Sequence, residues 1–111
     1  MPRTIAVAAL AVAYLISTPL FAADAVGVDI KLFQFKPKEL AVRKGATVTW
    51  TNGDAIEHSV TAGKPGKAAQ DFDSGLFTKG GSFSHTFDAS GSFNYFCKRH
   101  PNMQATVKVQ D

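Results

Sequence analysis

Short apolar segments with a period of two, separated by turn residues, constrain the fold of this chain more than any other feature of its sequence. Val26, Val28 and Ile30 alternate with small or polar residues, which is the pattern of a strand with one buried face. The same period recurs in four later segments, around residues 48–50, 83–87, 93–97 and 103–109. Since none of the chain reads convincingly as a helix, we expect an all-β fold, a Greek-key β-sandwich or barrel of seven or eight strands.

Two places depart from this alternation. The phase slips at Leu32 and Phe33, where a β-bulge would restore the pairing. Residues 63–71 are rich in Gly, Lys, Ala and Pro, and we expect a loop there, with one helical turn around Ala68 and Ala69.

Between these places lies a turn followed by another predicted strand. Residues 52–54 read Asn-Gly-Asp, a strong turn signal. Ile56, His58 and Val60 then share one phase, so we expect a strand that carries His58 on its inward face.

The first 25 residues have the pattern of a secretory signal peptide. Arg3 gives a positive start, residues 5–16 are twelve consecutive apolar residues, and Pro19 precedes small residues at positions 22, 23 and 25. We expect cleavage within residues 22–25, export to a bacterial periplasm and a single domain over residues 26–111. The apolar stretch is short for a membrane span, so we expect no stable membrane insertion. The alternative is an uncleaved N-terminal anchor.

Length, charge and cysteine content narrow the possible functions. A chain of 111 residues allows one small core, which excludes a multidomain enzyme. A net charge of +3 without a Lys/Arg run longer than two residues predicts no nucleic-acid partner. One cysteine excludes an intramolecular disulfide, and an exported protein that keeps a lone thiol usually uses it. We expect a monomer.

The segment that carries chemistry begins at this cysteine. Cys97, His100 and Met103 follow one another at intervals of three across one short connection between predicted strands. His58 lies 39 residues upstream of Cys97. Because His58, Cys97 and Met103 each continue the inward face of a predicted strand, all four side chains can meet at one end of the sandwich.

One thiolate, two imidazoles and one thioether form a soft set of metal ligands. A thioether is a poor ligand for zinc, calcium or magnesium, whereas thiolate and thioether together favour copper. Two histidines and a cysteine with a weak axial methionine are the ligands of blue-copper electron-transfer sites. The residues therefore predict one copper ion.

The residues around these ligands resemble the cupredoxin (blue copper) family, in its plastocyanin/amicyanin group. The resemblance rests on His58-Ser59-Val60, on residues 93–103 (FNYFCKRHPNM) and on the short spacing between Cys97, His100 and Met103, which is similar to that of amicyanins. It implies a cupredoxin-like fold and a type 1 site with His58, Cys97 and His100 as equatorial ligands and Met103 as the axial ligand. It also implies a single-electron carrier, not an enzyme, whose redox partner docks near His100. A c-type cytochrome or a periplasmic dehydrogenase fits that description.

Two features of the ligand segments differ from the family pattern. Glu57 precedes His58 where many relatives have proline, and Lys98 and Arg99 place two positive charges inside the ligand loop. We expect these charges to favour an acidic partner surface. We also expect Ser59 to hydrogen-bond the ligand loop.

Two other interpretations compete with this one. A thiol enzyme would use Cys97 as nucleophile and His100 or His58 as base, but it leaves Met103 unexplained. A copper carrier or sequestering protein would use the same four residues, and the sequence separates it poorly from an electron carrier.

His85 lies between Phe83 and Phe87 on one strand face, and we interpret it as structural.

Overall fold

The structure is a computed structural model that describes residues 24–111. The predicted signal peptide therefore lies outside the described residues, except for residues 24 and 25. None of the described residues form a helix that could span a membrane.

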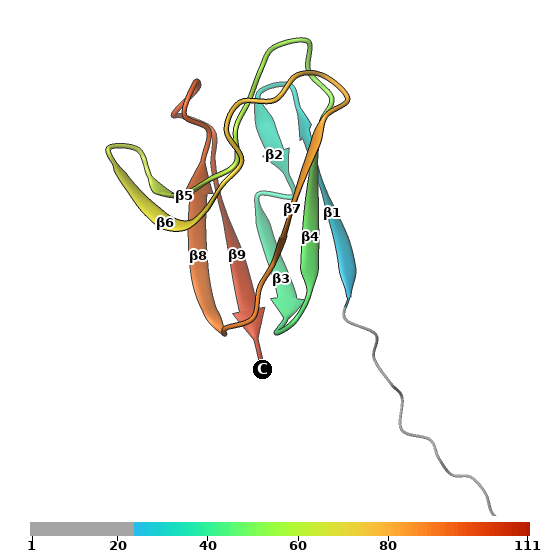
Figure 1. Cartoon of the computed structure of the whole chain (residues 1–111), viewed down its shortest axis with the longest axis vertical. Coiled ribbons are helices and arrows are strands. Elements are labelled where there is room, and N and C mark those ends of the chain that lie inside the picture. The colour runs from blue at the N-terminus through green and yellow to red at the C-terminus, as the bar shows by residue number, and fades with distance from the viewer. Residues whose placement is uncertain (1–23) are drawn as a thin grey trace, which may run out of the picture.

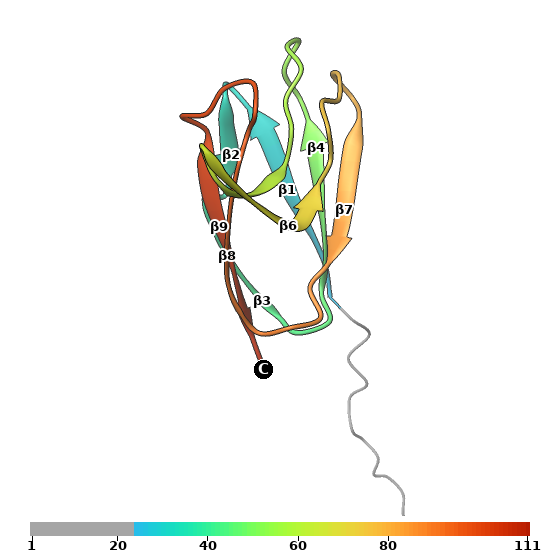
Figure 2. The same ribbon diagram turned by 60° about the vertical axis from the view of Figure 1, so that its left-hand side comes forward.

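The described chain forms two β-sheets that pack face to face (Figures 1 and 2). The four-stranded sheet has the order β2-β1-β4-β7, and the five-stranded sheet has the order β3-β9-β8-β5-β6. The β1–β4 and β3–β9 pairs are parallel, and the other pairs are antiparallel. The strands are β1 (Ala25–Lys31), β2 (Gln34–Lys36), β3 (Glu39–Arg43), β4 (Thr47–Asn52), β5 (Thr61–Lys64), β6 (Lys67–Asp73), β7 (Ser82–Thr86), β8 (Gly91–Phe96) and β9 (Gln104–Gln110).

The predicted all-β sandwich is confirmed, with nine strands in place of seven or eight. Its core lies between the sheets and is formed by the alternating residues of the sequence pattern. Val28, Ile30 and Trp50 are buried from the four-stranded sheet, and Tyr95 and Val107 are buried from the other. The Trp50 and Tyr95 rings meet edge to face across the sandwich, with centroids 5.4 Å apart. Burial of large aromatic rings supplies much of the stability of so small a core.

The phase slip at Leu32 and Phe33 is a hairpin turn and not the expected bulge. Lys31 pairs with Gln34, so these two residues form the whole connection between β1 and β2. Both have positive φ angles, 55° and 59°, as a type I′ turn requires. This conformation costs about 1–2 kcal/mol for each residue that is not glycine. The turn must therefore be held by contacts outside itself.

The loop and helical turn expected over residues 63–71 are wrong, because this segment forms the β5–β6 hairpin. All but one of the β6 residues are exposed, since β6 is the edge strand of its sheet. An edge strand exposed in this way shows no apolar alternation, which is the signal on which the prediction depended.

The strand expected over residues 56–60 is also wrong. His58 forms one isolated antiparallel bridge with Phe77, and the side chain of Ile56 is 39% exposed. This segment leaves β4 in one sheet and enters β5 in the other, so it cannot run along either sheet. His58 is nevertheless fully buried, as the sequence pattern predicts.

Four connections gather at the end of the sandwich that lies opposite the C terminus (Figure 1). They are the β1–β2 turn, the β4–β5 connection, the β6–β7 connection and the β8–β9 loop of residues 97–103. The candidate metal ligands come from two of these connections, so the fold places them at this end.

The β5–β6 hairpin depends on close backbone approach at Gly63. Gly63 has a φ of +104°, and a Cβ there would lie 2.4 Å from the backbone nitrogen of Ala69. We predict that Gly63→Ala lowers the free energy of unfolding by about 3 kcal/mol or more, because backbone atoms must move to admit the methyl group.

Gly66→Ala is the matched control, since Gly66 also has a positive φ, +80°, but a Cβ there meets nothing within 4 Å. It should lower the free energy of unfolding by only about 1–2 kcal/mol, the cost of the backbone conformation. Urea titrations of the metal-free proteins measure both values. Equal losses would show that crowding at Gly63 is unimportant.

Candidate metal centre

His58 is held at both its backbone and its ring. Its N–H donates to the Phe77 carbonyl at 3.2 Å, and its own carbonyl accepts from the Phe77 N–H at 2.9 Å. The ring Nε2 lies 2.9 Å from Oδ2 of Asp54. An ionised carboxylate only accepts hydrogen bonds, so Nε2 carries the proton and Nδ1 presents a lone pair.

This lone pair faces the sulfur of Cys97, which lies at the end of β8 and is fully buried. The Cys97 Sγ is 3.7 Å from Nδ1 of His58 and 3.9 Å from Nδ1 of His100. All three ligand atoms lie within 4.8 Å of one another. The structure therefore brings together three of the four predicted site residues, from segments 39 residues apart in sequence.

Met103 closes the short loop that begins at Cys97. The Cys97 N–H donates to the Met103 carbonyl at 3.1 Å, and the Met103 N–H donates to the His100 carbonyl at 2.9 Å. The Met103 side chain is buried. These bonds make residues 97–103 a compact turn, with all three predicted ligands of the loop at the same end of the sandwich.

The three ligand atoms fit a metal ion. An ion at the centre of a triangle with edges of about 3.7 Å would lie about 2.1 Å from each corner, close to usual metal–nitrogen and metal–sulfur lengths. The two edges at Cys97 Sγ are of this size. Two imidazoles, a thiolate and a nearby thioether form the donor set that favours copper.

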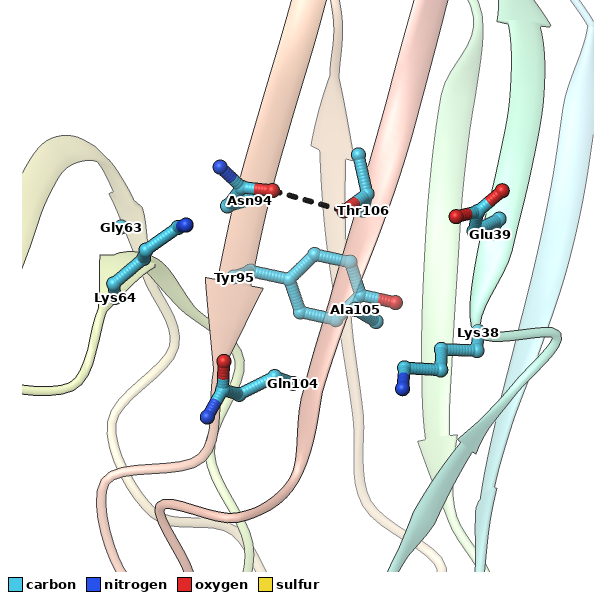
Figure 3. Close-up of a pocket in the computed structure, with 9 residues that line it drawn as sticks. All are labelled: Lys38, Glu39, Gly63, Lys64, Asn94, Tyr95, Gln104, Ala105 and Thr106. Carbon is cyan, nitrogen blue, oxygen red and sulfur yellow. Dashed lines mark hydrogen bonds between the residues drawn. The ribbon is translucent and has the colours of Figure 1, made fainter.

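A surface hollow elsewhere on the molecule holds none of the four predicted site residues (Figure 3). It lies over β8 and β9 on the five-stranded sheet, where Asn94 accepts a hydrogen bond of 2.9 Å from the hydroxyl of Thr106. Lys38 and Lys64 flank it. The candidate metal centre is therefore separate from this hollow. Its His58 and Cys97 side chains are fully buried.

Ser59 connects the two ligand segments, as predicted from the sequence. Its backbone N–H points at the Cys97 Sγ from 3.3 Å, where it would stabilise a thiolate. Its hydroxyl accepts the backbone N–H of Lys98 at 2.9 Å and lies 2.9 Å from the Thr61 hydroxyl. Ser59 is fully buried, so both contacts are shielded from water.

The two positive charges of the ligand loop each meet a carboxylate of this chain. Lys98 forms an ion pair with Asp73 at the end of β6, and Arg99 lies 3.4 Å from Glu57. Burial acts to raise the pKa of Asp73, but hydrogen bonds from Lys98, the Gly75 N–H and Thr61 outweigh it and lower the pKa. Charges paired in this way attract an external partner less than the sequence suggests.

His100 is half-buried at the surface end of the centre. Partial burial lowers its pKa, and positive charge on His58 and Arg99 would lower it further, against the opposing effect of Asp54. A lowered pKa keeps the imidazole neutral, which is the form that binds a metal.

Two residues near the centre were not predicted from the sequence. The carboxylate of Asp54 is bonded to His58, and the ring of Phe33 contacts both His58 and His100. The sequence places Asp54 only in a turn. The one available signal is its place four residues before His58, which says nothing about burial.

Asp54 itself is almost completely buried. Burial acts to raise its pKa, but hydrogen bonds from the backbone N–H groups of Phe33 and Leu32, together with His58, outweigh that effect and lower the pKa. The carboxylate is therefore ionised where it meets His58.

His85 lies outside this cluster. Its ring packs between Phe72 and Phe87, with centroid distances of 4.8 and 4.7 Å. Partial burial lowers its pKa, against the opposing charges of Asp71 and Asp88. These contacts agree with a structural role.

Residues 22–110 match the family of copper-binding proteins that includes plastocyanin and azurin. An amicyanin from Paracoccus versutus is 38% identical over 89 residues, which cover 79% of this chain and 67% of the relative. An amicyanin-alpha from Methylorubrum extorquens is 30% identical over 105 residues, which cover 95% of this chain and 88% of the relative.

Solved structures agree with these sequence matches. A purple cupredoxin from Nitrosopumilus maritimus superposes with a TM-score of 0.71 at 30% identity, covering 77% of this chain and 99% of that one. The crystal structure of the Paracoccus versutus amicyanin gives a TM-score of 0.68 at 36% identity, covering 81% of this chain and 85% of that one.

The hydrogen bond from Lys98 to the Ser59 hydroxyl gives a prediction about stability. Ser59→Ala leaves the backbone N–H of Lys98 without this acceptor. We expect the free energy of unfolding of the metal-free protein to fall by about 1–3 kcal/mol. Urea titration measures the change.

Ser84→Ala is the matched control, because the Ser84 hydroxyl bonds Thr49 at 2.7 Å on an exposed strand face. Its effect should stay within about 0.5 kcal/mol. If Ser59→Ala were as mild as the control, the hydroxyl would not hold the loop.

Proposed function

The chain belongs to the plastocyanin/azurin family of copper-binding proteins, and we propose that it is a type 1 copper protein that carries single electrons between redox partners. One observation carries the proposal. The Cys97 Sγ lies 3.7 Å from Nδ1 of His58 and 3.9 Å from Nδ1 of His100 inside the end of a β-sandwich, and one ligand atom from each of these residues lies within 4.8 Å of the others.

We assign the metal ligands as the sequence predicts them. His58, Cys97 and His100 would hold the copper ion, and the Met103 thioether would be a weak fourth ligand. Copper bound there would supply the Cu(I)/Cu(II) redox couple, which takes up and releases one electron. The protein's own task is to hold the ligands still and to exclude water.

Several contacts restrain the ligands. Asp54 holds the His58 ring, the Ser59 N–H points at the Cys97 sulfur, and the two backbone bonds of Met103 close the ligand loop. Side chains so held move little when the charge at the centre changes, and this favours rapid electron transfer. Full burial of Cys97 also argues against a thiol enzyme, because no substrate could reach the sulfur.

An apolar rim around the centre is the surface on which we propose that partners dock. It consists of Leu32, Phe33, Ile56 and Leu76, which are the exposed large hydrophobic residues of the described chain, with exposures of 65%, 48%, 39% and 47%.

Each rim residue lies near a ligand. Phe33 touches His58 and His100, and Leu32 precedes it in the same turn. Ile56 lies two residues before His58, and Leu76 precedes Phe77, which bridges to His58.

A rim of this kind suits a small, short-lived complex. Transient redox complexes bury little surface, and a few apolar side chains around a half-buried His100 are enough for one. Since Lys98 and Arg99 are paired with carboxylates of this chain, we propose that apolar contact contributes more to docking than charge. The partner is a redox protein, such as a c-type cytochrome or a periplasmic dehydrogenase.

We also propose that the protein is exported to a periplasm. The proposal rests on the signal-like pattern of residues 1–25. β1 begins at Ala25, so cleavage after residue 22 or 23 would leave this strand whole.

The ligand assignment predicts the colour of the copper protein. Cu(II) added to the metal-free mature protein should produce an intense blue or green thiolate-to-copper absorption band. Cys97→Ser and His58→Gln should abolish or strongly shift this band. His85→Gln should leave it unchanged, because His85 lies outside the cluster. A colourless wild-type complex would disprove the proposal.

Competition with a chelator distinguishes between an electron carrier and a copper carrier. The same protein, loaded with Cu(I), is mixed with an excess of a high-affinity chelator. An electron carrier with an enclosed centre should release copper over hours. Release within seconds would favour a copper carrier.

The apolar rim predicts how fast two copies of the protein exchange an electron. Ile56→Lys places a charge on the rim, so we expect the rate of electron self-exchange between the Cu(I) and Cu(II) forms to fall about tenfold. Line broadening in NMR spectra of mixed samples measures this rate.

Ala41→Lys adds the same charge on the exposed face of β3, away from the rim, and should change the rate less than about twofold at moderate salt. If both variants slow the exchange equally, net charge and not the rim controls docking.

A further inference from the structure

One carboxylate contacts two separate parts of the candidate centre. Asp54 Oδ1 accepts the backbone N–H of Leu32 at 2.8 Å, and Oδ2 accepts the N–H of Phe33 at 2.9 Å. Oδ2 also lies 2.9 Å from Nε2 of His58. Asp54 is almost completely buried, so water does not compete effectively for these bonds.

The residues in the turn do not explain why the turn forms. Leu32 and Phe33 both have left-handed backbone conformations, with φ angles of 55° and 59°. Two-residue turns of this kind prefer asparagine and glycine, which tolerate positive φ. The two turn N–H groups point at the Asp54 carboxylate, and these bonds offset the unfavourable conformation.

This turn places an aromatic ring on the centre. The Phe33 ring makes T-shaped contacts with both histidines. Its centroid lies 5.4 Å from that of His58, with an interplanar angle of 88°, and 5.0 Å from that of His100, with an interplanar angle of 84°. A turn that moved would remove this ring from both imidazoles.

We infer that Asp54 is a positioning residue for the centre, because its one carboxylate holds His58 with Nδ1 free and holds Phe33 against both histidines. The inference rests on the proposed role of His58 as a ligand. It adds that the tautomer of the buried histidine and the position of the ring that covers the centre are set by the same side chain. A partner that docks on Phe33 therefore contacts a residue whose backbone N–H is hydrogen-bonded to Asp54, and Asp54 also holds the ring of the ligand His58.

A simpler alternative is that Asp54 only stabilises the turn. The two roles can be separated, because Leu32→Gly relieves the backbone conformation without touching His58. Leu32 is 65% exposed, so little packing is lost with its side chain. The experiment therefore compares wild type, Asp54→Asn, Leu32→Gly and the double variant.

The first measurement uses metal-free protein. Long-range proton–nitrogen NMR reports which ring nitrogen of His58 carries the proton. We expect the proton on Nε2 in wild type and Leu32→Gly, and a mixture of both tautomers in Asp54→Asn and in the double variant. The midpoint of urea unfolding should fall in Asp54→Asn and recover at least in part in the double variant.

The second measurement is Cu(II) affinity, by competition with a chelator. Loss of a residue that orients a ligand typically weakens metal binding 10–100-fold, about the loss we expect for Asp54→Asn. The double variant should recover stability but not affinity. Asp29→Asn, which removes an exposed carboxylate on β1, is the matched control and should bind like wild type.

The outcomes distinguish this inference from the proposed function. If Asp54→Asn keeps the Nε2 proton and binds Cu(II) within threefold of wild type, Asp54 does not position His58. If Leu32→Gly restores both affinity and tautomer in the double variant, Asp54 acts only through the turn, and the inference also fails. If wild type shows no thiolate–copper band while Asp54→Asn still changes the tautomer, the copper assignment fails and the positioning of His58 stands. Should Asp54→Asn not fold, the double variant supplies the same measurements.

Discussion

The candidate centre depends on the contact between residue 59 and the ligand loop. The chain crosses between the two sheets at residues 53–60, and the β5–β8 ladder ends at the Thr61–Phe96 pair, just short of the ligand residues. Two hydrogen bonds continue the connection beyond this pair, one from the Ser59 N–H to the Cys97 sulfur and one from the Lys98 N–H to the Ser59 hydroxyl. With the two segments joined, His58 faces Cys97 and His100, and the remaining contacts of the centre refine that arrangement.

The charged side chains of the ligand loop form ion pairs within this chain, so they are less available to a partner. Lys98 and Asp73 connect it to the end of the β5–β6 hairpin, and Arg99 and Glu57 connect it to the segment before His58. Exposed ion pairs of this kind each contribute little to stability. Their effect is to cancel charge beside the centre, which leaves an apolar surface around His100 despite the basic composition of the chain.

The sequence was most informative where a pattern repeats or where residue type alone restricts chemistry. Alternation predicts the sandwich and the burial of Trp50 and Tyr95, and the spacing of Cys97, His100 and Met103 predicts the ligand loop. Exposed edge strands carry no alternation, so the sequence predicts a loop where β6 forms. The crossing at residues 56–60 shows a strand-like phase because His58 and Val60 are buried, yet it pairs with only one residue.

Asp54 could not be assigned from the sequence, because its partners are backbone groups of a turn 21–22 residues earlier in the chain. Turn conformation at Leu32 and Phe33 depends on these bonds and contradicts the local preferences of both residues. Residues whose local preference is overruled by distant contacts are the ones that sequence patterns describe least well.

The direction of the strands has a practical consequence. β1 begins and β9 ends at the end of the sandwich that lies opposite the ligand loops (Figure 1). A linker attached after residue 111 would therefore leave the apolar rim unobstructed. The protein could be immobilised on an electrode through its C terminus with His100 facing the solution, and its current could be recorded while soluble donors and acceptors are presented to the free end.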